Sequence, residues 1–117
     1  MTIRDLAAYL VSRTAAVEDH PWGPTPAVFK VGGVDGPMFA ILSTEADPPQ
    51  VSLKCDPDLA EGLRRTHPAV RPGYHLNKRH WNTVTVDGSL PDDEVRAMID
   101  HSWEQVVAGM PRAKRPA

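Results

Sequence analysis

The segment from Pro72 to Thr83 is richer than any other part of the chain in side chains suited to binding chemistry. Its twelve residues include two aromatics, two histidines, two amides and two cations. Aromatic rings offer flat stacking faces, Lys and Arg pair with phosphate oxygens, and amides hydrogen-bond to polar edges. This combination predicts a surface that binds an anion or a nucleic acid. The side chains concerned are Tyr74, His75, Asn77, Lys78, Arg79, His80, Trp81 and Asn82.

The same segment belongs to a longer stretch that carries no acidic residue. Residues 62–86 include no Asp or Glu, but they include five Lys or Arg and three His. The whole chain has a net charge of −2, from 13 basic and 15 acidic side chains. We therefore expect a local anion-facing surface on a protein without an overall cationic field; a solvated basic edge is the alternative. Arg71 lies in this stretch, and Lys54 ends a predicted strand near it.

Trp81 has two interpretations, and the sequence leaves both open. In the first, the rings of Trp81 and Tyr74 stack on a ligand while the neighbouring cations Lys78 and Arg79 contact phosphates. In the second, Trp81 and Leu76 fill the core, and the amides fix an irregular loop. The two interpretations are compatible with each other.

The common catalytic and cofactor-binding patterns are missing from the sequence. It has no glycine-rich phosphate loop, no G-x-S-x-G, no H-E-x-x-H and no calcium-binding loop. The single cysteine, Cys55, excludes an internal disulfide, and its place at a strand end is typical of a small packing residue. His75 and His80 have no Asp, Glu or Cys nearby, whereas a metal needs about three convergent ligands. We expect no catalytic activity, no metal and no cofactor.

Length and composition indicate one compact domain. The chain has 117 residues and 41% hydrophobic side chains, which is ordinary for a globular protein. Its longest apolar run, from Met38 to Leu42, is far shorter than the ~20 residues that span a bilayer. No secretory signal is visible at the N-terminus. We expect a cytoplasmic protein that does not bind membranes, most simply a monomer.

Helix and strand patterns occur in an order typical of an α+β protein. Thr2 and Asp5 form a capping box ahead of an apolar helical stripe, and Asp56-Pro57 is a helix start. Alternating apolar runs between glycine or proline breaks indicate strands in hairpin order. Helices are expected at 3–14, 57–67 and from 91 onward, and strands at 27–31, 38–42, 50–54 and 81–86.

This order predicts an antiparallel β-sheet with helices packed on one face, the N- and C-terminal helices flanking the strands. Residues 1–110 should form a single domain, and the basic tail at 111–117 should be disordered because it has nothing to bury. The predicted core consists of Leu6, Leu10, Phe29, Phe39, Ile41, Leu53, Leu63, Val84, Ile99 and Val106.

The chain resembles the MmcQ/YjbR family over nearly its whole length, from Ile3 to about Val107. The most specific string is Tyr-His-Leu-Asn-Lys-Arg-His-Trp-Asn at 74–82. Further strings of the family pattern occur in the same order, at 21–23, 28–31, 38–40, 52–57, 87–94 and 99–103.

The resemblance implies a CyaY-like α+β fold, related in architecture to frataxin. It also implies DNA binding through a double-wing arrangement of β-hairpins. The acidic ridge that frataxin uses for iron does not transfer, because the first helix here carries only Asp5.

We therefore expect a non-enzymatic binding protein that contacts double-stranded DNA weakly and salt-sensitively through the basic segment at 62–86. The expected contact residues are Lys54, Arg71, Tyr74, His75, Asn77, Lys78, Arg79, His80 and Trp81. The alternative is a binding module for a small anionic ligand or a protein partner.

Overall fold

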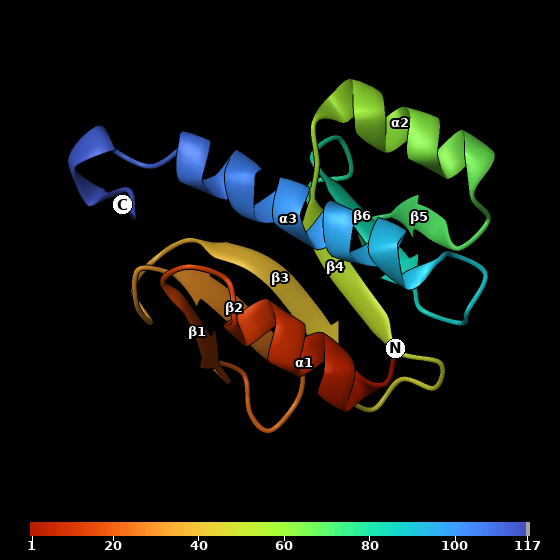
Figure 1. Cartoon of the computed structure of the whole chain (residues 1–117), viewed down its shortest axis with the longest axis horizontal. Helices are drawn as coiled ribbons and strands as arrows, with labels where there is room; N and C mark the ends of the chain where they lie inside the picture. Colours follow the sequence, from red (N-terminus) through yellow and green to blue (C-terminus); the bar gives the residue numbers. More distant parts are fainter. Residues whose placement is uncertain (117) are drawn as a thin grey trace.

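A computed structural model describes residues 1–116 as one two-layer α+β unit, with a sheet on one side and helices on the other (Figure 1). The helices are α1 (Ile3–Val11), α2 (Pro57–Thr66) and α3 (Asp92–Ala108), followed by a 3₁₀ turn η1 (Arg112–Lys114). The strands are β1 (Ala16–Asp19), β2 (Ala27–Val31), β3 (Met38–Ser43), β4 (Gln50–Lys54), β5 (Val70–Pro72) and β6 (Trp81–Thr85).

The sheet is antiparallel throughout, in the order β1-β2-β3-β4-β6-β5. The first four strands form a meander, and the chain then crosses through α2 to the edge strand β5 before β6 returns beside β4. The predicted α+β class and antiparallel sheet are confirmed. The short edge strands β1 and β5 are additions to the expected set.

All three helices lie on one face of the sheet, as predicted. In Figure 1, α1 and α3 cross in front of the strands, and α2 lies beyond α3 over β5 and β6. Ser102 fixes α3 to the sheet, because its buried hydroxyl donates to the Phe39 carbonyl at 2.6 Å and accepts from the Lys54 amide at 2.8 Å. No α-helix of residues 1–116 covers the opposite face, which we call the outer face.

The helix starts follow the predicted local signals. The Thr2 hydroxyl accepts from the Asp5 amide at 3.1 Å, and the Asp5 carboxylate accepts from the Thr2 amide at 2.9 Å. Asp56 caps α2, with Pro57 as its first residue. Acidic side chains occupy the first turn of α3, where the helix dipole favours them.

Eight of the ten predicted core residues lie in the core between the sheet and the helices; Ile41 and Leu63 do not. Side chains alternate across a strand, so Leu42 points to the helices, whereas Ile41 points to the outer face and is only half-buried. Leu63 is half-buried because it lines an open groove beside α2.

The C-terminal segment, where the sequence predicts a disordered tail from Pro111, contains one short helical turn. Residues Arg112–Lys114 form a 3₁₀ turn. The Arg115 guanidinium donates to the carbonyls of Met110 at 3.0 Å and Ala108 at 2.9 Å, which satisfies acceptors at the end of α3. Residue 117 lies outside the described residues. None of the helices in the described range has the length and apolarity that crossing a membrane requires.

Candidate functional site

The β5–β6 loop (residues 73–80), which holds most of the predicted binding residues, is fixed by its own polar groups. Gly73 lies so close to Trp81 that a Cβ on Gly73 would be 2.8 Å from the Trp81 Cβ. The Lys78 ammonium donates to the Gly73 carbonyl at 3.0 Å, and the Asn77 side-chain oxygen accepts from the Arg79 amide at 2.9 Å. Lys78 and Asn77 therefore shape the loop.

Arg64 joins this loop to α2. Its guanidinium donates to the Asn82 side-chain oxygen at 2.6 Å, to the Trp81 carbonyl at 3.3 Å and to the Lys78 carbonyl. The amide of buried Asn82 donates in turn to the Ala60 carbonyl at 3.4 Å. Arg64, one of the five cations of the acid-free stretch, thus has a structural role.

The structure separates the predicted contact residues into an exposed and a buried set. Trp81 is only 8% exposed, which supports its interpretation as a packed residue over that as an exposed stacking platform. Tyr74 is 73% exposed. Arg71 pairs in register with Thr83, so its exposed side chain leaves the sheet on the outer face. His75 and Arg79 are exposed on the loop, whereas Lys54 and His80 are half-buried.

The outer face contains a hollow of about 380 Å³ between two loops. One wall comes from the β5–β6 loop and the other from the β1–β2 loop (residues 20–26). Trp22, which is 63% exposed, projects from the second loop and was not among the residues predicted to bind. The sequence did carry a sign that Trp22 is exposed, because it stands between a proline and a glycine and belongs to no apolar stripe. The lining residues are Trp22, Pro26, Ile41, Ser43, Gln50, Ser52, Tyr74, His75, Leu76 and Thr83.

His20 braces the loop that carries Trp22. One ring nitrogen lies 2.8 Å from a Glu18 carboxylate oxygen and the other lies 3.1 Å from the Pro24 carbonyl. Both partners are acceptors, so only the protonated ring donates to both. The hydrogen bond to Glu18 is the main reason why the pKa of His20 is raised above its ordinary value.

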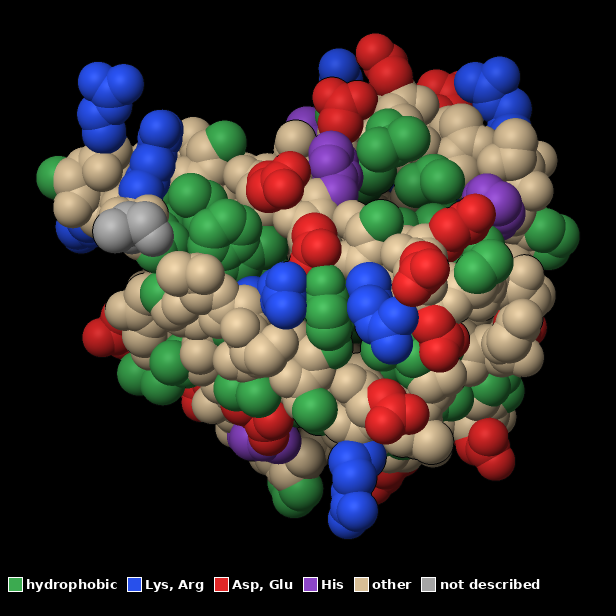
Figure 2. Space-filling view, viewed as in Figure 1, with side chains coloured by type: hydrophobic (Ala, Val, Ile, Leu, Met, Phe, Trp, Pro, Cys, Tyr) green, Lys and Arg blue, Asp and Glu red, His purple; other side chains and the backbone are tan. Residues whose placement is uncertain are grey.

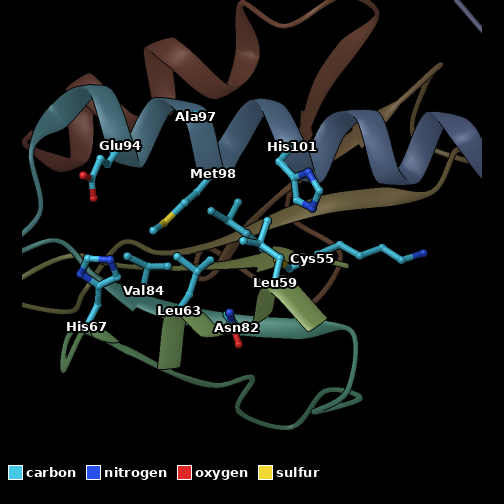
Figure 3. Close-up of a pocket in the computed structure, with 12 residues that line it drawn as sticks. Cys55, Leu59, Leu63, His67, Asn82, Val84, Glu94, Ala97, Met98 and His101 are labelled. Atoms are coloured by element: carbon cyan, nitrogen blue, oxygen red, sulfur yellow. The ribbon is translucent and has the colours of Figure 1, made fainter. Parts of the chain in front are cut away.

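A second recess, of about 350 Å³, lies between α2 and α3 over β4 and β6 (Figure 3). Its lining is mainly apolar and includes Leu59, Leu63 and Met98. The ring of His101 accepts from the Asp56 amide at 3.1 Å. Desolvation raises the pKa of the buried Cys55 thiol to about 11, so at neutral pH this recess contains a protonated thiol and no nucleophilic thiolate.

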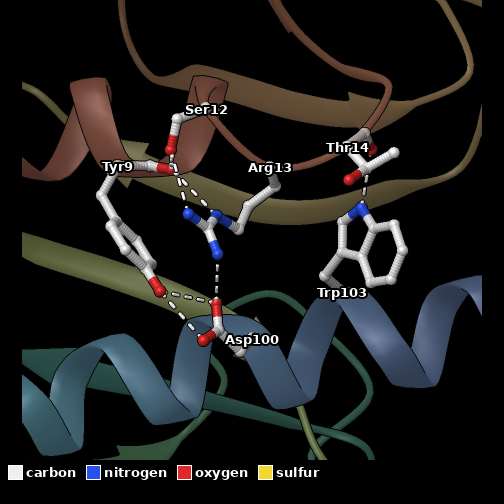
Figure 4. Close-up of polar contacts among 6 residues, drawn as sticks. All are labelled: Tyr9, Ser12, Arg13, Thr14, Asp100 and Trp103. Carbon is white, nitrogen blue, oxygen red and sulfur yellow. Dashed lines mark hydrogen bonds and ion pairs between the residues drawn. The ribbon is translucent and has the colours of Figure 1, made fainter.

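Polar contacts that join α3 to the end of α1 and to the residues that follow it are structural (Figure 4). The Tyr9 hydroxyl donates to both Asp100 oxygens at 2.8 and 2.9 Å, and Arg13 donates to the same carboxylate at 3.0 Å. The Trp103 indole donates to the Thr14 carbonyl at 2.9 Å. Burial, followed by the bond to Asp100, raises the pKa of Tyr9.

Apart from the recess between α2 and α3, neither the charges of the helix-bearing face nor the histidines indicate another type of site. Figure 2 shows basic and acidic side chains interspersed over the helix-bearing face, without a continuous basic patch. Within residues 1–116, no three His, Cys, Asp or Glu side chains converge as metal ligands would.

Comparisons with known proteins identify the same family that the residue strings of the sequence indicate. The family model of YjbR matches residues 11–105. The chain is 42% identical to the uncharacterized protein YjbR of Escherichia coli strain K12, covering 98% of this chain and 95% of that protein. It is 37% identical to the uncharacterized protein YbdF of Escherichia coli O157:H7, covering 81% and 74% respectively.

Solved structures share the same fold. The crystal structure of a Deinococcus radiodurans protein with the domain DUF419 superposes with a TM-score of 0.91 at 38% identity, covering 97% of this chain and 85% of that one. A crystal structure from Pseudomonas syringae gives a TM-score of 0.78 at 30% identity, covering 91% and 99%. Sequence and fold agree, and the chain therefore belongs to the YjbR family.

Proposed function

We propose that this protein is a non-enzymatic, cytoplasmic protein that binds double-stranded DNA with the outer face of its sheet. The observation that carries the proposal is the uncovered sheet face, which has a hairpin loop at each edge and an exposed arginine on its surface. Two raised loops beside an open face fit the double-wing arrangement that the family resemblance implies.

The charges around this face favour a polyanion. No acidic side chain of the described chain lines the hollow. Arg71 projects from the sheet beside it, and Arg79 is exposed on the β5–β6 loop. The Lys78 ammonium donates one N–H to the Gly73 carbonyl and has two further N–H groups that can donate to a phosphate. So few cations on a chain of net charge −2 should give weak binding, with a Kd of about 10⁻⁴–10⁻⁶ M at physiological salt.

The alternative function, a small-ligand or partner module, has its own observation. The recess between α2 and α3 falls within the volume range of small-molecule sites, and Leu59 at its edge is an exposed large apolar side chain. Its apolar lining suits an apolar group better than an anion, so it supports this function without explaining the basic stretch.

The test is a fluorescence-anisotropy titration of labelled duplex DNA at several salt concentrations. Affinity should fall with salt, with a log–log slope of about −0.9 for each phosphate neutralised. The double variant Arg71→Ala/Arg79→Ala should reduce the magnitude of this slope by about two and weaken all sequences alike, because phosphate contacts carry no base identity.

The matched control is Arg112→Ala/Lys114→Ala, which removes the same charge from the C-terminal segment. It should change the slope by much less than the first pair does. Equal slopes for the two double variants would mean that binding follows net charge alone. The absence of duplex binding at low salt would overturn the proposed function.

A further inference from the structure

Two exposed aromatic side chains converge on one hollow of the outer face. Trp22 and Tyr74 come from loops at opposite edges of the sheet, and both line the same space of about 380 Å³. They are 63% and 73% exposed. Single exposed apolar residues are common on protein surfaces, but two aromatics that converge on one concave space indicate a site for a flat, apolar group.

The floor of the hollow combines one apolar residue with several hydrogen-bonding groups. Half-buried Ile41 provides the apolar surface. The hydroxyls of Ser52 and Thr83 lie 2.9 Å apart, and Ser43 and Gln50 add a hydroxyl and an amide. Hydroxyl and amide groups both donate and accept hydrogen bonds, so this floor suits the mixed polar edge of a nucleobase.

The two walls are held in place before any ligand binds. On one side, His20 contacts Glu18 and the Pro24 carbonyl, which fixes the turn around Trp22. On the other, the Tyr74 amide donates to the Thr83 hydroxyl at 3.3 Å, and the Tyr74 and His75 rings lie 3.9 Å apart between centroids. Fixed walls lower the conformational cost of binding.

A cation beside the hollow suits an anionic chain that carries the flat group. Arg71 leaves the outer face opposite Thr83 in the register, next to the floor, where it is placed to pair with a phosphate. We propose that the hollow takes up one unpaired base of a bound DNA strand, at Trp22 and Tyr74. A base inside a continuous duplex is stacked and paired, so its flat faces are inaccessible; a bulged base is free to enter.

This inference rests on the proposed function, and three duplexes of the same sequence test it. One is fully paired, one carries a single extra base, and one carries an abasic residue at the same extra position. The wild type should bind the duplex with the extra base at least about 5-fold more tightly than the abasic one, because stacking is worth about 1–3 kcal/mol per base.

The variants Trp22→Ala and Tyr74→Ala should each remove most of this ratio between the extra-base and abasic duplexes. Val34→Ala, which truncates an exposed apolar residue of the β2–β3 loop, should retain the wild-type ratio. Arg71→Ala/Arg79→Ala should weaken binding to all three duplexes. Far-UV circular dichroism and thermal unfolding confirm that each variant is folded.

The outcomes separate this inference from the proposed function. A ratio of one in the wild type, with salt-dependent binding to the paired duplex, overturns the base site and leaves duplex binding in place. Binding of the extra-base duplex without binding of the other two supports the base site and overturns the binding of fully paired DNA. No binding to any of the three overturns both.

Discussion

At the scale of single residues, the protonation of His20 depends on one neighbour in β1 and one in the loop that presents Trp22. His20 is exposed, yet both of its ring nitrogens have acceptors. Its pKa is raised chiefly by the hydrogen bond to Glu18, then by the Pro24 carbonyl and by the charges of Glu18 and Asp19. Protonation of the His20 ring therefore favours the contacts that hold the loop presenting Trp22.

We expect Glu18→Gln to lower the pKa of His20, because the charged acceptor is lost. A raised pKa in the folded state means that protonation stabilises the fold. That contribution is fully present below the ordinary value of 6.5 and is lost as pH rises through the folded pKa. An NMR titration of the histidine ring protons measures the shift. Glu45→Gln, which changes an exposed carboxylate in another loop, should leave the pKa of His20 unchanged; equal values in all three proteins would contradict the assignment.

At the scale of elements, one arginine links α2 to the sheet. Arg64 on α2 satisfies the side-chain oxygen of buried Asn82 on β6, and it also donates to the Lys78 carbonyl in the β5–β6 loop and to the Trp81 carbonyl at the start of β6. The next residue, Arg65, is exposed and pairs only with Glu61 at 3.3 Å on the same helix. The two arginines are neighbours in sequence, but only Arg64 links separate elements.

We expect Arg64→Ala to destabilise the fold by about 1–3 kcal/mol, because it leaves the buried Asn82 oxygen without its donor. Arg65→Ala should cost less than about 1 kcal/mol, since an exposed ion pair contributes little. Urea unfolding of both variants measures the difference. Equal losses of stability in the two variants would contradict a stabilising role for the Arg64 link between α2 and β6.

Local signals predicted the elements well, and elements without such signals were missed. The capping box at Thr2 and the Asp56-Pro57 start gave α1 and α2, because these interactions lie within a few residues. β5 has only three residues and ends in Pro72, so no alternation was visible. Its position at the sheet edge depends on pairing with β6, which is a tertiary interaction.

The candidate site was predicted only in part, for the same reason. Composition identified Arg71 and Tyr74, which the structure places on or beside the outer face. It did not show that Trp81 is buried or that Trp22, about 50 residues from Tyr74 in the chain, shares a hollow with it. Which aromatic is free and which is packed depends on how distant strands pair.

At the scale of the whole molecule, helices cover one face of the sheet and leave the other uncovered. Adjacent residues of β3 point to opposite faces. Leu42 is fully buried beneath the helices, whereas its neighbour Ile41 lies on the floor of the hollow. We therefore expect the covered side to supply most of the apolar burial that stabilises the fold, with Val28, which pairs with Ile41 and is buried on the outer side, as an exception.

We expect Leu42→Ala to cost about 2–5 kcal/mol in urea unfolding, the usual range for a fully buried leucine. Ile41→Thr keeps a β-branched side chain and removes only partly buried apolar surface, so it should cost less than about 1 kcal/mol. Both unfolding midpoints should be independent of protein concentration if the chain is a monomer with a free outer face. A large loss for Ile41→Thr, together with a midpoint that rises with concentration, would show that a second copy covers this face in solution and would remove the space on which the base site depends.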